Sequence, residues 1–331
     1  MPPTRWWVWI GAGLSLGLLV VLIWRLDWGS FWKALEMLRP AWAAGTAACL
    51  VLGIGTRALR WNVLAGVPLQ RYWRVWQSAS LGYLGNMIYP ARAGEFLRVA
   101  AISRFAQVPA GAAVTSAVLD RIFDGLFWGL MLIVVILHGT SVPGHAALFG
   151  VTSGVAVAGV LAISFILWGD QFEARLTRWL THAPPSFKEK GIRWYGQATA
   201  ATHVMRRPRQ ILSVLLLTVV AFGLDFLSYW LLLKAFGWSL PAMAAITLGV
   251  FVLLGASLPS APGYIGIHQL ACILALHLFG IPESHAIAYS VVFQLLMFLV
   301  IGVQGGWAMV SCGLRLSDLP PTPAQGARES S

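Results

Sequence analysis

Charge is scarce in this sequence, and acidic residues are the scarcest of all. Asp, Glu, Lys and Arg make up 11% of the 331 residues, and 12 residues in total are acidic. Soluble domains carry about 25% charged residues. Here hydrophobic residues make up 58% of the chain, and the mean hydropathy is +0.74. This composition excludes an ordinary soluble domain and predicts an integral membrane protein.

Strand patterning, catalytic motifs and metal-ligand spacings are also missing. Leu, Ala, Gly and Val dominate the apolar runs without polar alternation, so we expect helices rather than barrel strands. No nucleophile elbow and no phosphate-binding GK loop occurs. The cysteines Cys49, Cys272 and Cys312 lie in apolar stretches and are expected to be inert packing residues. We therefore expect no metal, no cofactor and no enzymatic activity.

The formal charge of +11 arises from basic residues at the ends of apolar segments. This pattern indicates cytoplasmic loops facing anionic lipid, so we expect no nucleic-acid partner. Two basic segments are predicted to be cytoplasmic: 57–74, and the linker 170–209, which has eight basic residues against three acids. The segment 138–145 has no Lys or Arg and is predicted to lie outside.

Apolar segments long enough to be helices recur along the chain. They fall at 6–24, 41–56, 75–89, 96–107, 112–137, 146–168, 210–233, 242–258, 264–280 and 285–311. We predict an all-α polytopic protein with about six full spans and two re-entrant helical hairpins. The first segment is interpreted as a retained anchor, and both termini are placed in the cytoplasm of a bacterial inner membrane. A single domain is expected over 1–314, with halves 1–168 and 210–314 and a flexible tail 315–331.

Both hairpins are predicted from helix breakers inside apolar sequence. The segment 96–107 is short and holds Arg98 and Arg104, so 75–107 is interpreted as a hairpin with its tip at Pro90–Glu95. A second tip at Ser257–Gly266 separates 242–258 from 264–280. Pro90 precedes Gly94 by four residues, as Pro259 precedes Gly263. This spacing fits either an inverted repeat, whose broken helices would form a transport site, or coincidence.

The first tip places Asn86, Arg92, Glu95 and Arg98 together. Glu95 and Arg98 are three residues apart on one helical face and are expected to pair. Arg92 is then the freer cation for a lipid phosphate, which arginine binds in bidentate fashion. The alternative is a buried ion cluster or a position at the headgroup plane. Ionisable residues within a membrane favour a functional role.

The next helix holds Asp120, Arg121 and Asp124. The two acids lie four residues apart on one face. They are interpreted either as counter-charges for Arg92 and Arg98 or as direct substrate ligands.

The second tip is uncharged. Its residues Ser257, Pro259, Ser260, Pro262, Gly263 and Gly266 are predicted to form a neutral cradle of amides and hydroxyls for an anion, or else a plain turn. Asp225 lies in an apolar run, so it either finds a partner elsewhere in the bundle or is protonated as a relay. His268 is a second relay candidate, although a packed histidine is the commoner case.

These motifs together resemble the lysylphosphatidylglycerol synthase transmembrane-region, or flippase-like, family. The matching residues are Arg57-x-x-Arg60-Trp61, Asn86-x-x-x-Pro90-x-Arg92-x-Gly94-Glu95-x-x-Arg98, Asp120-Arg121-x-x-Asp124 and Ser257-Leu-Pro259-Ser260-x-Pro262-Gly263-x-x-Gly266. The sequence departs from the family pattern at Tyr264 and at His268–Gln269. The resemblance implies a membrane domain that flips lipids. The cytosolic aminoacyl-transferase domain of the best-understood members is not expected here, so synthase activity is not carried over.

Three functions follow as hypotheses. The first is a lipid translocase that moves a phosphate-bearing, anionic amphiphile between leaflets of the inner membrane, with membrane lipids as its partners. The second is a lipid-linked glycosyl or aminoacyl transferase. The third is a non-transporting partner of a lipid biosynthetic enzyme.

Overall fold

The computed structural model describes residues 27–89, 93–137, 196, 207–256 and 262–314, and in these ranges regular structure is entirely helical. Four long helices dominate: α3 (Pro40–Leu64), α6 (Ala110–Leu137), α9 (Pro208–Ala235) and α12 (Glu283–Ser311). Of these, α3, α9 and α12 are long and apolar enough to cross a membrane. The helix α6 has 28 residues but carries Asp120, Arg121 and Asp124 near its middle.

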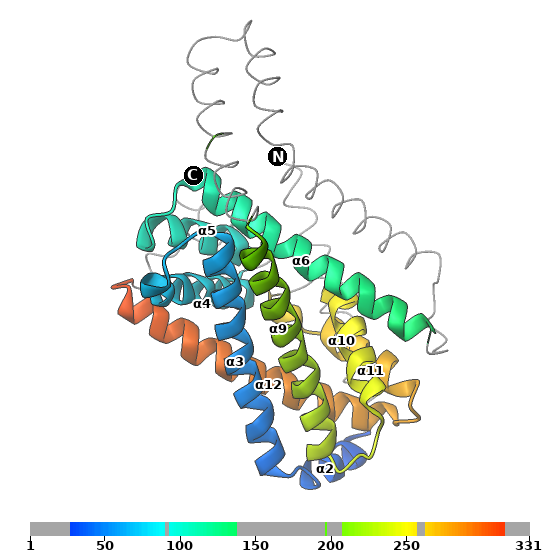
Figure 1. Ribbon diagram of the computed structural model, residues 1–331. Helices are drawn as coiled ribbons and strands as arrows, with labels where there is room; N and C mark the ends of the chain where they lie inside the picture. The colour runs from blue at the N-terminus through cyan, green and yellow to red at the C-terminus, as the bar shows by residue number, and fades with distance from the viewer. Residues whose placement is uncertain (1–26, 90–92, 138–195, 197–206, 257–261, 315–331) are drawn as a thin grey trace, which may run out of the picture.

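The helices α3 and α9 form a central antiparallel pair (Figure 1). The amide of Arg39 donates to the carbonyl of Ala235 at 2.8 Å, where α3 begins and α9 ends. Further along, the Thr46 hydroxyl donates to the Ser228 carbonyl at 3.4 Å. Proline at the first turn of each helix supplies the helical φ without costing a hydrogen bond. This pair gives the bundle two opposite ends, one at the C-terminus of α3 and one at the C-terminus of α9.

A pair of shorter helices follows each member of the central pair. After α3 come α4 (Tyr72–Ile88) and α5 (Gly94–Phe105), which pack closely on each other. After α9 come α10 (Ala242–Ala256) and α11 (Ile267–His277), joined through the 3₁₀ turn η4 (Pro262–Tyr264). Because α3 and α9 are antiparallel, the two hairpins start from opposite ends of the bundle. Between the two pairs, η4 contacts α4.

Glycine permits the close packing of the first hairpin. A Cβ at Gly94 would lie 2.0 Å from the Gly82 carbonyl oxygen and 2.4 Å from the Asn86 amide nitrogen. No side chain fits there, so the backbones of α4 and α5 touch directly next to the tip. In η4, Gly263 has φ +70, and a Cβ would meet the Phe298 ring at 2.6 Å. Both tips therefore depend on a glycine.

A short helix, α2 (Trp28–Glu36), precedes α3 and was not predicted. Asp27 caps it, accepting hydrogen bonds from the Gly29 amide at 3.0 Å and the Ser30 amide at 3.3 Å. The hydroxyl of Ser30 donates to the same carboxylate at 2.6 Å. These bonds, the Ser30 hydroxyl first among them, lower the pKa of Asp27.

The all-helical prediction is confirmed for the described residues, and one boundary is wrong. The predicted loop 57–74 begins inside α3, which continues to Leu64. Arg57 and Arg60, which belong to this predicted cytoplasmic segment, both lie within the bundle. The segments 6–24, 138–145, 146–168, 170–195 and 315–331 lie outside the described residues, so the span count, the location of the termini and the tail stay predictions.

The order long helix, short pair, long helix occurs twice, as α3, α4–α5, α6 and as α9, α10–α11, α12. This order matches the inverted repeat that the Pro–Gly spacing left open. Together with the opposite starting points of the hairpins, it favours that alternative over coincidence.

Candidate functional site

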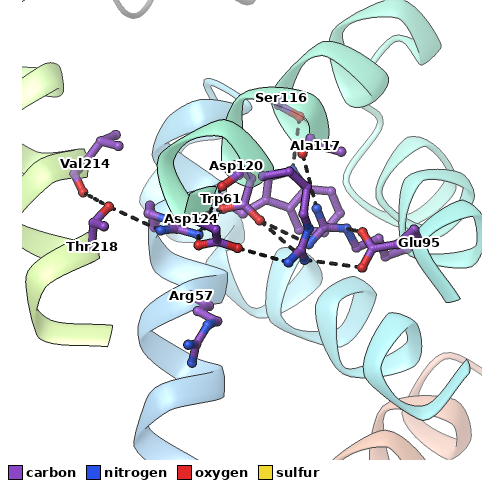
Figure 2. A network of polar contacts seen from close by, with 12 residues as sticks. Arg57, Trp61, Glu95, Ser116, Ala117, Asp120, Asp124, Val214 and Thr218 are labelled. Atoms are coloured by element: carbon purple, nitrogen blue, oxygen red, sulfur yellow. Dashed lines mark hydrogen bonds and ion pairs between the residues drawn. The ribbon is translucent and has the colours of Figure 1, made fainter. Parts of the chain in front are cut away.

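A buried arginine on α3 is the centre of an ion network. The side chain of Arg60 is 0% exposed; its Nε donates to Asp120 Oδ1 at 3.0 Å and its Nη2 to Asp124 Oδ1 at 2.5 Å. Its Nη1 donates to the Thr218 hydroxyl on α9 at 3.2 Å. Figure 2 shows Asp120 and Asp124 projecting from α6 into this network. Arg60 thus ties α3, α6 and α9 together through a single guanidinium.

Arg98 joins the first hairpin to the same network. It lies 3.1 Å from Asp120 Oδ2 on α6 and 2.9 Å from Glu95 Oε2 on its own helix. Its guanidinium covers the Trp61 ring at 4.8 Å, and the indole nitrogen of Trp61 donates to the Ser116 hydroxyl at 3.1 Å. The predicted Glu95–Arg98 pair is therefore present. Arg98 is buried and holds the hairpin in place, so it is poorly placed to meet a ligand.

Arg121 is the outer member of the network. Its side chain is 42% exposed, and it pairs with Asp124 at 3.0 Å and with Glu95 at 3.3 Å. Asn86, on α4, donates to Glu95 at 3.3 Å and is near the tip. These exposed contacts are the part of the network that a ligand can reach and rearrange.

A second ion pair stands apart from this network. Arg57, one turn before Arg60 on α3, makes two hydrogen bonds to Asp225 on α9; the Nη1–Oδ1 distance is 3.1 Å. Both side chains are 18% exposed. Figure 2 shows Arg57 away from the dashed contacts of the main network. Asp225, predicted either to find a distant partner or to be protonated, has Arg57 as that partner.

The second tip is held by a chain of buried amides. The Gly266 amide donates to Gln269 Oε1 at 2.7 Å, and the Gln269 side chain donates to Gln294 on α12. Gln294 Nε2 then donates to the Gly263 carbonyl at 2.7 Å. The departure from the family pattern at Gln269 is therefore a structural link between η4, α11 and α12. His268 stacks on Phe293, with the ring centroids 5.7 Å apart.

One cavity of about 510 Å³ touches both tips and both ion groups. Its polar wall includes Asn86, Glu95, Arg121 and Asp124 from the first half and Asp225 from the second, together with Arg57 and Tyr83; Gly263 and Tyr264 reach it from η4. The rest of the wall is apolar and comes largely from α10 and α12. Its volume is in the range of about 300–1,000 Å³ typical of small-molecule sites. A polar wall facing an apolar one suits an amphiphile.

Comparison with known families gives a match over most of the chain. The profile described as lysylphosphatidylglycerol synthase TM region matches residues 8–305. The chain belongs to this family. The chain is accordingly a multi-pass membrane protein. The name of the family connects it with lipid metabolism. No curated protein and no solved structure matched the chain.

The structure brings together most of the residues predicted for this family member. Six of them line the cavity: Asn86, Glu95, Arg121, Asp124, Asp225 and Gly263. Arg98 and Asp120 lie behind it in the buried network, and His268 is packed in α11. Pro262 begins η4, and Gly266 lies between η4 and α11. Arg92, Ser257, Pro259 and Ser260 lie outside the described residues. Asp120 is a counter-charge for Arg98, as one alternative held. Asp124 pairs instead with Arg60 and Arg121.

Three contributors were missed as site residues: Arg57, Arg60 and Tyr83. A signal was present, because Arg57 and Arg60 are three residues apart and directly follow an apolar run, on one helical face. The positive-inside rule explained them as loop residues instead. Among the described residues, no group of three or more His, Cys, Asp and Glu side chains is arranged to hold a metal ion.

Proposed function

We propose that this protein is a lipid translocase, moving a phosphate-bearing amphiphile between leaflets without changing it chemically. The single observation that supports this best is the shared cavity, whose polar wall joins the two hairpin tips while its other walls are apolar. A headgroup would contact Arg121, Arg57 and the backbone of η4, and the acyl chains would lie along α10 and α12. Helix breaks in corresponding positions of two repeats are where transporters bind substrate.

We expect Arg121→Gln and Arg92→Ala each to slow translocation by about tenfold or more, because each removes a charge-assisted contact worth roughly 1.5–3 kcal/mol. The measurement is the leaflet exchange of NBD-labelled phosphatidylglycerol, and of an aminoacylated and a polyprenyl-phosphate lipid, in proteoliposomes. Arg74→Gln, at the end of the bundle, is the control and should leave the rate unchanged.

The same assay separates the alternatives. If wild-type protein and Arg92→Ala exchange every lipid in the panel equally poorly, translocation is refuted. Formation of a new lipid product, detected by mass spectrometry of the same liposomes, would support a transferase instead. Copurification with a lipid biosynthetic enzyme, without exchange by the isolated protein, would support the non-transporting role.

We further propose an inner-membrane orientation with the C-terminal end of α3 in the cytoplasm. At that end Arg71, Arg74, Arg104, Arg207 and Arg209 lie without an acid among the described residues. The opposite end mixes basic residues (Lys33, Arg39, Lys234) with acids (Asp27, Glu36, Glu283). The excess of arginine at this end follows the positive-inside rule.

A cysteine-labelling experiment tests this orientation. In intact cells, a membrane-impermeant maleimide should label Lys33→Cys and leave Arg209→Cys unlabelled until the membrane is opened. The reverse labelling pattern would invert the topology.

A further inference from the structure

Asp225 differs from the other carboxylates of the site in how its charge is compensated. Asp120 lies within 4.0 Å of three arginines, and Asp124 and Glu95 each pair with two. In the described part of the chain, Asp225 has one ion-pair partner, Arg57. Both side chains line the cavity and are 18% exposed. The charge of Asp225 therefore depends on a single neighbour that a ligand can reach.

The formal charges of the ion-paired residues that the structure describes at this site add up to zero. Four arginines (Arg57, Arg60, Arg98 and Arg121) face four carboxylates (Glu95, Asp120, Asp124 and Asp225). A phosphate diester entering the cavity adds one negative charge to surroundings that solvate charge poorly, which is unfavourable unless it is neutralised. Arg57 already presents two donors to a carboxylate, and the same two donors fit a phosphate.

When Arg57 turns to a phosphate, Asp225 loses its counter-charge. An isolated carboxylate on a partly buried wall is stabilised by taking up a proton. One proton from water then binds Asp225, the phosphate replaces Asp225 beside Arg57, and the total charge of the site returns to zero. Release of the headgroup reverses both steps, and the proton is released on the side of the membrane where the lipid arrives.

The other titratable groups near Arg57 are less suited than Asp225 to take up this proton. Cys49 on α3, Tyr229 on α9 and Tyr83 on α4 belong to residue types that are protonated at neutral pH. Tyr264 lines the cavity from η4. Asp124 on α6 keeps the buried Arg60 as a partner even when a headgroup contacts Arg121. Among the described cavity residues of α10 and α12, none has a titratable side chain. His268 on α11 stacks on Phe293, at the edge of the cavity wall.

Resting on the translocase function proposed above, we propose that Asp225 couples lipid movement to protons, with one proton carried for each phosphate-bearing headgroup that engages Arg57. The transmembrane proton gradient would then be the energy source.

Two measurements test this. In proteoliposomes with NBD-labelled phosphatidylglycerol, acidifying the compartment that faces the lipid's starting leaflet should accelerate wild-type translocation by up to about tenfold per pH unit. In Asp225→Asn the ratio of rates with and without the gradient should fall to one. In weakly buffered detergent, binding of phosphatidylglycerol micelles should take up one proton per wild-type protein and none in Asp225→Asn.

Control variants keep the result interpretable. Asp27→Asn, at the cap of α2, should retain the gradient ratio. The double variant Arg57→Gln/Asp225→Asn removes one positive and one negative charge, so the net charge of the site is unchanged. It should elute as a single species, which shows that it folds, and it should also lack proton uptake. A gradient response that persists in Asp225→Asn would overturn the proposal. The absence of proton uptake by the wild type would also overturn it. In that case Arg92, rather than a proton, would neutralise the phosphate.

The two proposals fail differently. If the wild type moves the lipid equally fast with and without a gradient, proton coupling is refuted and translocation stands. If the wild type binds lipid with proton uptake but does not move it, the translocase function is refuted while the exchange at Asp225 stands.

Discussion

Replacing Arg60 by leucine is expected to lower the free energy of unfolding by about 3–5 kcal/mol, the usual cost of leaving a buried charge without its partner. The Arg60 guanidinium is fully buried, and it lies 2.7 Å from Asp120 and 2.5 Å from Asp124. Without it, two carboxylates on α6 lose a shared counter-charge, and Thr218 loses a donor. Unfolding in mixed micelles, followed by tryptophan fluorescence, measures the change.

The matched control is Arg121→Leu. This removes the same group from the same two acids and from Glu95, but the Arg121 side chain is 42% exposed, so water can replace much of its effect. We expect a loss of about 1 kcal/mol or less. If Arg60→Leu cost no more than this control, the buried network would not be what holds α3, α6 and α9 together.

Replacing Gly94 by alanine is expected to cost about 3 kcal/mol, at the upper end for an overpacked contact, and to abolish translocation. A methyl group at this position would lie 2.0 Å from the Gly82 carbonyl oxygen and 2.6 Å from Asn86 Oδ1. Backbone atoms cannot swing aside as a flexible side chain can. The helices α4 and α5 must therefore separate, which moves Asn86 and Glu95 out of the cavity wall. Thermal unfolding and lipid exchange measure the two effects.

Gly223→Ala is the control for this change. Gly223 lies in α9, and a Cβ there would meet nothing within 4 Å. Alanine is the better helix former, so this variant should be as stable as the wild type or gain up to about 1 kcal/mol. If Gly94→Ala behaved like Gly223→Ala, the close contact of α4 and α5 would not be needed.

The sequence was sufficient to locate both pairs of short helices and the four carboxylates of the described ion pairs. Breakers such as Pro90 and Gly263 stand out against apolar runs, and with 12 acids in the chain any acid within such a run is conspicuous. The Glu95–Arg98 pair follows from a spacing of three residues on one helix. These signals are local, and local signals can be read from a single sequence.

The partners of these residues could not be predicted, because they come from distant parts of the chain. Arg57 and Asp225 are 168 positions apart, and Arg60 and Thr218 are 158 apart. A rule based on charge at helix ends cannot distinguish an arginine in a loop from one that continues a helix toward a buried acid. The amide chain through Gln269 and Gln294 likewise depends on how α11 packs against α12.

The central claim is that the cavity between the two tips is the route of the lipid headgroup, and site-directed blocking tests it most directly. In a protein with Cys49, Cys272 and Cys312 replaced by alanine, single cysteines are placed at Met87 on α4 and at Met297 on α12, which line the cavity from opposite halves. Leu295→Cys, an exposed position on α12, is the control.

Translocation of NBD-labelled phosphatidylglycerol is then measured before and after reaction with a bulky maleimide. Labelling at Met87→Cys or at Met297→Cys is expected to stop translocation, excess lipid should slow both labelling reactions, and labelling at Leu295→Cys should have no effect. Undiminished translocation with both cavity positions fully labelled would contradict the account.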